Sequence, residues 1–300
     1  MQMHKNSVSV VIPSYNGLDL ISKNLPLVLK AAEHKGNQIL EVIVVNDGSV
    51  DQSVDFIKQN FPQVKVVSHK KNRGFSSAVN TGVRSSKGSL IALINNDVAP
   101  SENFLVKALG HFSDAKVFAV SFHEDGYSWA EGSFKDGFVS HGSGQNTKDV
   151  HRTLWVSGGS GIFRRDLWVK LGGMDEKLFS PYYWEDIDLG YRAFKRGYEL
   201  LWEPDSLVFH RHESTVSRLP KKKVQRIQER NQLIFIWKNI TSANLFRKHV
   251  VGLAKRVVTH PGYLLIVASA LFRLGSISKA RRRERKECKI SDEAIFASFR

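Results

Sequence analysis

Short β-branched runs alternate with segments of helical spacing over the first 120 residues, and this alternation constrains the fold most. The expected strands are residues 8–12, 41–45, 64–67, 90–94 and 117–122, and the expected helices are residues 18–34, 53–60, 75–85 and 103–112. Alternation with short connections predicts an α/β fold, in which a mostly parallel, Rossmann-like sheet carries helices on both faces.

Polar segments follow three of these runs directly. They are Pro13-Ser14-Tyr15, Asn46-Asp47-Gly48 and Asn95-Asn96-Asp97. In open parallel sheets, ligands bind beyond the carboxyl ends of the strands. We therefore expect the three segments to converge on one crevice.

The side chains in this crevice are typical of a site for a nucleoside-diphosphate donor. Asp97, beside Asn95 and Asn96, offers a hard oxygen ligand to Mg²⁺ or Mn²⁺ at a diphosphate. Asp47 can accept a hydrogen bond from a base or ribose, and Arg73 can pair with phosphate. Each has a structural alternative: Asp47 in a turn, Asp97 as a strand-end cap and Arg73 as a surface charge.

A second acidic cluster follows three aromatic residues at 182–184. Glu185, Asp186 and Asp188 lie within four positions of one another. A carboxyl group kept against aromatic surface tends toward a raised pKa, which suits a proton acceptor near neutral pH. The alternative is an acidic first turn that stabilises a helix, the role we expect for Asp188.

The middle of the chain has less periodicity. Residues 124–152 are rich in Gly, Ser, His and Asp, which favours a long loop over the crevice and a candidate lid. Helices are expected at 164–171 and 188–196, and a short strand at 207–209 leads to His210. The glycines of 158–161 lack the G-x-G-x-x-G spacing of a dinucleotide site.

Charge divides the chain into two regions. Residues 1–210 hold 23 Lys/Arg and 23 Asp/Glu, whereas residues 211–300 hold 21 and 6, a balance of +15. We expect a domain over 1–240 and a basic, amphipathic helical C-terminal region over 241–300. Such a region favours an anionic membrane surface. A homodimer contact through these helices is the alternative, and no recognition fold for nucleic acid accompanies the charge.

The cellular location is predicted from the N-terminal residues, the cysteine content and the length of the apolar runs. The polar start of the chain does not resemble a signal peptide. Cys288 is the sole cysteine, which fits a reducing compartment. No apolar run reaches 18 residues, so a spanning helix is not expected. The expected location is cytoplasmic, peripheral on the inner face of the cell membrane.

Eight motifs occur in an order that resembles one known family, the inverting family-two glycosyltransferases of the GT-A fold. The resemblance covers about residues 7–240, and the closest branch is similar to the rhamnosyltransferases. The motifs are VVIPSYN (10–16), VIVVNDGS (42–49), NRGF (72–75), LINND (93–97), GGSGIFRR (158–165), GGMDE (172–176), WEDIDLGYR (184–192) and VFHRHES (208–214).

The resemblance implies a role for each candidate residue. Donor-side residues would hold the nucleotide sugar, and acceptor-side residues would shape the second half of the pocket. Asp186 would be the catalytic base, while Asp97 and His210 would bind the metal, with His212 a rival for His210. The donor-side residues are Pro13, Tyr15, Asp47, Arg73, Asn95, Asn96 and Asp97. The acceptor-side residues are Trp155, Gly158, Gly159 and Glu185, although Glu185 could equally be structural.

The implied activity is transfer of a sugar from dTDP-rhamnose, a UDP-sugar or a GDP-sugar to a hydroxyl of a glycan or lipid-linked acceptor, with inversion. Asn95 replaces the first acid of the family's D-x-D pattern, but dependence on Mg²⁺ or Mn²⁺ is still expected. Two alternatives stay open: a nucleotidyltransferase, and a non-catalytic nucleotide-sugar-binding or scaffold protein of the same fold.

Overall fold

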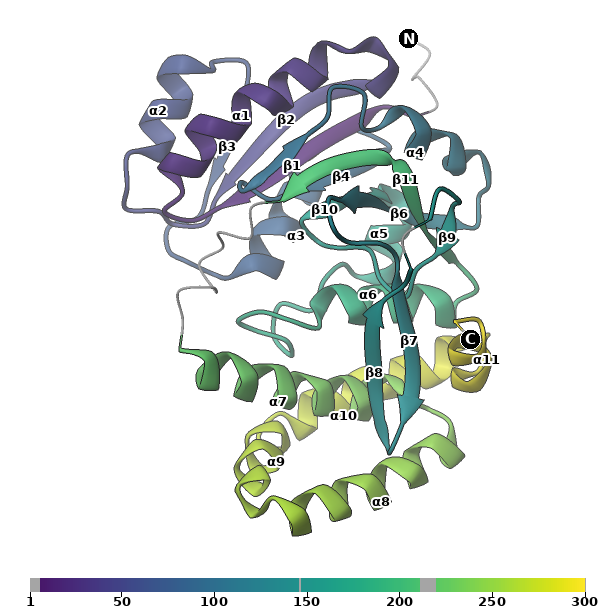
Figure 1. The fold of residues 1–300 in the computed structure, drawn as a ribbon. Coiled ribbons are helices and arrows are strands. Elements are labelled where there is room, and N and C mark those ends of the chain that lie inside the picture. Colours follow the sequence, from purple (N-terminus) through teal and green to yellow (C-terminus); the bar gives the residue numbers. More distant parts are fainter. Residues whose placement is uncertain (1–5, 146, 211–219, 300) are drawn as a thin grey trace.

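The computed structural model describes residues 6–145, 147–210 and 220–299. Among these residues, nine strands form one sheet in the order β3-β2-β1-β4-β10-β6-β11-β5, with β9 paired to β11 (Figure 1). The strands of this sheet are β1 (Val8–Ser14), β2 (Ile39–Asn46), β3 (Lys65–Ser68), β4 (Leu90–Ile94), β5 (Val98–Pro100), β6 (Val117–Glu124), β9 (His151–Arg152), β10 (Ser160–Arg164) and β11 (Glu199–His210).

Helices cover both faces of this sheet, as predicted. Val10 and Ile12 of β1 pack in one core with helix α1, whereas Val11 packs in the other core with Ala78 of helix α3. Successive side chains of a strand point to opposite faces, so both faces of a buried strand must be apolar. The helices of this region are α1 (Leu18–Glu33), α2 (Ser53–Asn60), α3 (Phe75–Ser85), α4 (Val106–Gly110), α5 (Arg165–Leu171) and α6 (Glu185–Lys195).

The predicted α/β class with a largely parallel sheet is confirmed, and β11 also runs parallel to β6, although antiparallel pairs join the parallel parts of the sheet. Strands β3, β2, β1 and β4 are parallel, as predicted. Strand β10 runs antiparallel to both β4 and β6, and β11 is antiparallel to β5 and β9. The chain enters β10 after a long excursion instead of a crossover helix, and antiparallel pairing needs no such helix.

The excursion contains a hairpin, so the expectation of an irregular loop over 124–152 was wrong. Strands β7 (Ala130–Lys135) and β8 (Phe138–Ser143) pair in register through a two-residue turn. The turn is Asp136-Gly137, and both residues have positive φ, of 52° and 83°. Asp-Gly is a strong signal for this type of turn, but the polar composition of the flanking segment masked it.

Two other boundaries differ from the expectations. The helix expected at 103–112 is shorter, with α4 followed by a single 3₁₀ turn at His111–Ser113. The strand expected at 207–209 is the end of the twelve-residue β11. Pro204 suggests a break in the sequence, but the strand accommodates it where the register with β6 shifts between Glu203 and Leu207.

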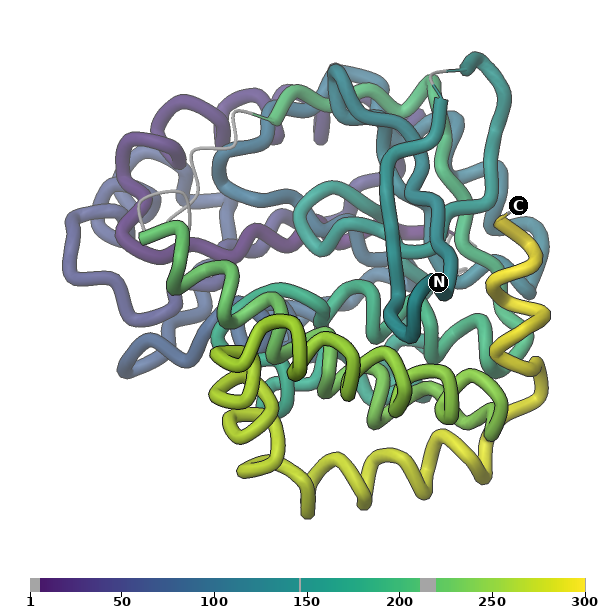
Figure 2. The backbone as a smooth tube through the Cα atoms, turned by 60° about the horizontal axis from the view of Figure 1, so that its bottom comes forward, coloured from purple at the N-terminus to yellow at the C-terminus, as the bar shows by residue number. Residues whose placement is uncertain are grey.

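The last eighty residues are helical and gather below the sheet (Figures 1 and 2). Phe235 packs against Tyr191 of α6, and Lys195 Nζ lies 3.0 Å from Asp292 Oδ1 in a fully buried ion pair. The division at residue 240 stays a prediction. The helices are α7 (Lys221–Asn239), α8 (Ala243–Thr259), a 3₁₀ turn at Pro261–Tyr263, α9 (Leu264–Leu271), α10 (Leu274–Glu287) and α11 (Asp292–Ala297).

No single helix in the described ranges is long and apolar enough to cross a membrane. Two consecutive helical segments, Pro261–Leu271 and Leu274–Glu287, are long and apolar enough for a membrane span when taken together, but the chain bends by 71° between them.

The tip of the hairpin generates a prediction about stability. A Cβ on Gly137 would lie 2.6 Å from the backbone oxygen of Lys248, and the positive φ there disfavours any side chain. We expect Gly137→Ala to lower the free energy of unfolding by about 2–4 kcal/mol, from strain and overpacking together. Urea denaturation followed by circular dichroism measures the change.

Gly126→Ala is the matched control. Gly126 has a φ of 84°, but a Cβ there would meet nothing within 4 Å. Its loss of stability should be about 1 kcal/mol, the cost of the backbone conformation alone. Equal losses for the two variants would contradict the tight packing of the hairpin tip.

Candidate active site

The three predicted donor-side segments do lie together, at the carboxyl ends of β1, β2 and β4. Strand β1 lies between β2 and β4, and it pairs with both. The backbone amide of Asp47 donates to the carbonyl of Ser14 at 2.8 Å. The side-chain amide of Asn96 donates to Ser14 Oγ at 3.1 Å. Pro13 is buried and Tyr15 is half-buried beside them.

Asp47 organises the loop that carries Arg73. Its carboxylate accepts hydrogen bonds from the backbone amides of Arg73 and Gly74, at 2.9 and 2.8 Å, and it lies 2.6 Å from His69 Nδ1. The Arg73 guanidinium stays about half exposed and contacts Glu176 Oε2 at 3.3 Å. Asp47 is therefore more than the end of a turn, because it joins β2 to this loop.

Asn95 meets Gly159 across the sheet. The backbone amide of Asn95 donates to the backbone carbonyl of Gly159 at 2.8 Å. A Cβ on Gly159 would lie 2.2 Å from the Asn95 side chain. A Cβ on Gly158 would lie 2.8 Å from Met174 Cε. Gly159 therefore packs directly against the Asn95 side chain, and Gly158 packs against Met174.

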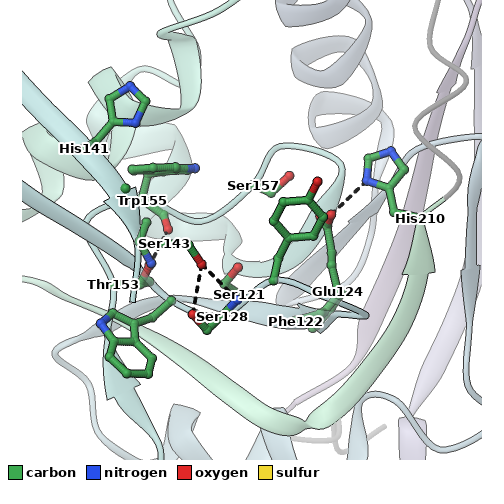
Figure 3. A pocket seen from close by; sticks show the side chains of 14 residues that line it. Ser121, Phe122, Glu124, Ser128, His141, Ser143, Thr153, Trp155, Ser157 and His210 are labelled. Carbon is green, nitrogen blue, oxygen red and sulfur yellow. Dashed lines mark hydrogen bonds and ion pairs between the residues drawn. The ribbon is translucent and has the colours of Figure 1, made fainter. Parts of the chain in front are cut away.

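His210 joins Asp97 to a residue that was not expected, Glu124. His210 Nε2 lies 3.1 Å from Asp97 Oδ1, and Nδ1 lies 3.0 Å from Glu124 Oε2 (Figure 3). Ser160 Oγ also donates to Glu124. Burial by itself would lower the pKa of His210, but hydrogen bonds and charge from Asp97 and Glu124 raise it to about 9. His212 lies outside the described residues.

The donor set at Asp97 fits a divalent cation. Asp97 is 2% exposed, and its Oδ2 atom has no hydrogen-bond partner among the described residues. A buried carboxylate oxygen without a partner is costly, and a cation would satisfy it. Within the described ranges, no group of three or more His, Cys, Asp or Glu side chains has metal-binding geometry. Asp97 and His210 would thus hold a cation that takes its other ligands from phosphate and water.

Asp186 lines a cavity of about 440 Å³ with aromatic walls. Burial raises the pKa of its carboxyl to about 6, although the backbone amides of Ile187, Asp186 and Gly158 stabilise the charged form. The cavity is also lined by His141, Trp155, Tyr183, Trp184, Ile187, Gln228, Glu229 and Gln232. The raised pKa agrees with the expectation from the aromatic neighbours.

A strained turn presents Asp186 to this cavity. Tyr183 and Trp184 have φ angles of 72° and 76°, a left-handed conformation that non-glycine residues rarely adopt. The buried side-chain amide of Asn231, on α7, donates to the carbonyls of Tyr182 and Tyr183 at 3.0 and 2.9 Å. A distant helix thus holds the turn in its unfavourable conformation.

The two neighbouring carboxylates have opposite environments. Burial, and the nearby Asp186, raise the pKa of Glu185 well above its ordinary value and favour its protonated form. Burial would also raise the pKa of Asp188, but Lys238 and Arg192 keep it below its ordinary value. Asp188 is fully buried and pairs with Arg192 of α6 and Lys238 of α7, so it ties two helices together, a role beyond the first-turn stabilisation expected from the sequence.

A second cavity, of about 380 Å³, lies beside the first. Figure 3 shows His141 and Trp155 at one end of it and Glu124 with His210 at the other. His141 and Trp155 line both cavities, so these two side chains separate the Asp186 side from the Asp97 side. The base of the β7–β8 hairpin contributes Ser128, Trp129, Ala130, Gly142 and Ser143 to the walls of the second cavity.

Four residues of this region were not foreseen as functional: His69, Glu124, His141 and Glu176. Glu124 could have been found, because it ends β6 at the same edge of the sheet as the other strand-end acids. His141 could not, since its position depends on the hairpin.

Comparison with known proteins gives the family. The sequence model of "Glycosyl transferase family 2" matches residues 9–169, which is more than half of the 300 residues. The chain belongs to glycosyl transferase family 2. The rhamnosyltransferase branch stays a prediction.

Several glycosyltransferases are similar in sequence. The chain is 32% identical over 183 residues to the pre-mycofactocin glycosyltransferase of Mycobacterium tuberculosis (strain ATCC 25618 / H37Rv). This alignment covers 58% of this chain and 38% of that protein. It is 26% identical over 266 residues to the uncharacterized glycosyltransferase YibD of Escherichia coli (strain K12), and this alignment covers 81% of this chain and 73% of that protein. The chain thus spans well under half of the mycobacterial relative.

Solved structures confirm a GT-A-like fold. GalNAc-T7 with UDP, GalNAc and Mn²⁺ has a TM-score of 0.63 at 16% identity, over 85% of this chain and 58% of that one. The mannosyltransferase PcManGT of Pyrobaculum calidifontis, in complex with GDP-Man and Mn²⁺, has a TM-score of 0.56 at 18% identity, over 98% of this chain and 86% of that one.

Proposed function

We propose that this protein is a glycosyltransferase that moves a sugar from a nucleoside-diphosphate sugar to a hydroxyl group of a glycan or lipid-linked acceptor, with inversion. One observation carries the proposal. Asp186, whose pKa is about 6, faces an aromatic-walled cavity, and Trp155 separates that cavity from the one lined by His210, the partner of Asp97.

The donor would bind at the carboxyl ends of β1, β2 and β4. We expect Asp47 and Tyr15 to contact the nucleobase and ribose, and the half-exposed Arg73 to pair with phosphate. The UDP in GalNAc-T7 and the GDP-Man in PcManGT support a donor of this class. The base and sugar of the donor, including dTDP-rhamnose, remain alternatives that a thermal-shift panel of nucleotide sugars distinguishes.

A divalent cation, Mg²⁺ or Mn²⁺, would be held by Asp97 and His210. When bound, the cation stabilises negative charge on the departing diphosphate. The partnerless Oδ2 atom of buried Asp97 supports this assignment. His210 would hold a cation through Nε2 only after losing the proton that this nitrogen donates toward Asp97, while Nδ1 keeps its contact with Glu124.

Asp186 would act as the general base. Its carboxylate takes the proton of the acceptor hydroxyl while the hydroxyl oxygen forms a bond to C1 of the sugar. The bond between C1 and the phosphate oxygen breaks on the opposite face, and the nucleoside diphosphate leaves, so the configuration at C1 inverts. A pKa of about 6 leaves the carboxyl mostly ionised at neutral pH.

The acceptor would lie against the aromatic walls of the Asp186 cavity. Trp155, Tyr183 and Trp184 offer flat apolar faces on which sugar rings can pack, while Gln228 and Gln232 offer amides to hydroxyl groups. Gly159 keeps the floor close to Asn95, and Gly158 lies against Met174 and Phe75. Buried Glu185 lies behind Asp186, and its Oε2 atom has no partner among the described residues, which leaves an acceptor contact open to it.

The first prediction tests the base. Asp186→Asn should lower the transfer rate by about 100- to 10,000-fold, because the amide cannot accept the proton, while donor affinity stays within about twofold. Product formation and isothermal titration with the donor measure the two effects. A non-catalytic protein would show no transfer in either form.

Asp166→Asn is the matched control. Asp166 also lies in the first turn of a helix and accepts from the next backbone amide at 2.8 Å, as Asp186 does. It is exposed on α5, away from both cavities. Transfer by this variant should equal the wild type, and wild-type transfer by Asp186→Asn would exclude the assignment.

The pH profile provides a second test. Asp186 must be deprotonated to act, so kcat/KM should rise with pH, with a midpoint near 6, and fall about tenfold for each unit below it. Steady-state rates measured between about pH 4.5 and pH 8 would follow this rise of kcat/KM, because the carboxyl titrates within that range. A flat profile across pH 6 would remove Asp186 as the base.

The metal assignment predicts that a chelator abolishes transfer and that Mn²⁺ or Mg²⁺ restores it. A readout independent of activity is the shift in melting temperature that Mn²⁺ causes in the presence of a nucleoside diphosphate. Asp97→Asn should weaken that shift because it removes the negative ligand. Full activity in chelator would exclude a metal at Asp97.

A further inference from the structure

Helix α9 is apolar on both sides. One side is buried against α7 and the rest of the core, through Ile266 and Ala270. The opposite side is exposed and carries no polar residue: Leu264, Leu265, Ala268, Leu271 and Phe272. A helix that is hydrophobic all round normally lies inside a protein or a membrane, so the outer side of α9 calls for a partner.

The exposure is large at the centre of this surface. Phe272 is 91% exposed, Leu265 71% and Leu264 54%. Neighbouring α8 adds Val251 and Val258, which are 66% and 79% exposed. The end of α8 contacts the turn that leads into α9, where Arg256 lies over the Tyr263 ring at 5.3 Å, so the exposed apolar residues of the two helices belong to neighbouring elements. Figure 2 shows α8 and α9 meeting at one corner of the molecule.

Positive charge surrounds this surface. The sequence has no Asp or Glu between Glu229 and Glu284, while the same stretch holds eleven Lys and Arg residues. The helices on either side of α9 in sequence, α8 and α10, carry further exposed cations: Arg247, Lys248, Lys255, Lys279 and Arg282. Apolar side chains ringed by basic ones match the interface of an anionic lipid bilayer.

We propose that α8, α9 and the start of α10 form a docking surface for an anionic membrane, with Leu264, Leu265 and Phe272 entering the boundary between headgroups and acyl chains. The charge favours lipid over a second copy of the chain. Two copies meeting through this surface would oppose the same cations with no acidic residue of the stretch to pair them. The protein would then lie on the cytoplasmic side of the membrane, held by its surface.

This surface connects physically to the candidate active site. Helix α7 lines the Asp186 cavity through Gln228, Glu229 and Gln232, and α9 packs against the same helix. A membrane bound at α9 would therefore lie close to the acceptor side, which suits an acceptor carried on a lipid. Docking itself does not depend on catalysis, and its test uses no substrate.

The experiment is sedimentation of the full chain with vesicles. Vesicles of phosphatidylcholine alone are compared with vesicles of phosphatidylcholine and phosphatidylglycerol. The wild type should bind the anionic vesicles at least tenfold more tightly than the neutral ones, and added salt should release it. The double variant Leu265→Glu/Phe272→Glu should lose at least tenfold in binding, since two charges would have to enter the interface.

A double variant elsewhere on the surface controls for the added charge. Leu40 and Val169 are 57% and 61% exposed and lie outside the C-terminal helices, so Leu40→Glu/Val169→Glu adds the same charges away from α9. It should bind within about twofold of the wild type, and circular dichroism should show both double variants folded.

Three results would overturn the proposal. One is absence of binding to anionic vesicles, and another is equal loss in both double variants. The third is a concentration-dependent dimer in sedimentation velocity that Leu265→Glu/Phe272→Glu dissociates while vesicle binding is absent, which would make the surface a contact between copies. Binding that resists high salt and alkaline extraction would instead indicate insertion of the bent α9–α10 pair.

Discussion

The position of Asp186 depends on the side-chain amide of Asn231. Tyr183 and Trp184 hold left-handed backbone conformations that cost free energy, and the Asn231 amide donates to the carbonyls of this turn from α7. Two residues after Asp186, the fully buried Asp188 is tied to α7 through Lys238. Asp186 and the Asn231 amide that holds its turn are 45 residues apart in sequence, so this side of the cavity forms only when α6 and α7 pack together.

The donor side is held differently, by the sheet itself. Parallel pairing of β1 with β2 and β4 brings three strand ends to one edge, and Asp47 binds the loop before α3 to that edge. Such an arrangement needs little beyond regular backbone pairing. The acceptor side needs the hairpin and α7 in addition, and in this region the chain can vary without disturbing the donor edge. We therefore expect the hairpin and α7 to influence which acceptor the proposed transferase takes.

Periodicity predicted the regular half of the fold well. Buried parallel strands are continuous apolar runs, and the bounds of α2, α3 and β4 agree with the expected ones. The expectations failed where exposed or polar segments are ordered by contacts distant in sequence. The hairpin is held at its tip by His249, whose Nδ1 lies 2.7 Å from the Gly137 carbonyl. Glu124 and His141 became part of the site for the same reason, although only Glu124 follows from its position at a strand end.

The sequence by itself determined the family, the donor edge and the candidate roles of Asp47, Asp97 and Asp186, because local runs and short motifs carry that information. Only the tertiary structure decided that Asp188 joins α6 to α7, that Trp155 and His141 separate two cavities, and that α9 presents an apolar face to solvent. Those properties depend on burial and on contacts between distant segments. How deeply a side chain is buried sets the pKa of a carboxyl group and the free-energy cost of an apolar side chain left in water. A local sequence pattern does not specify that burial.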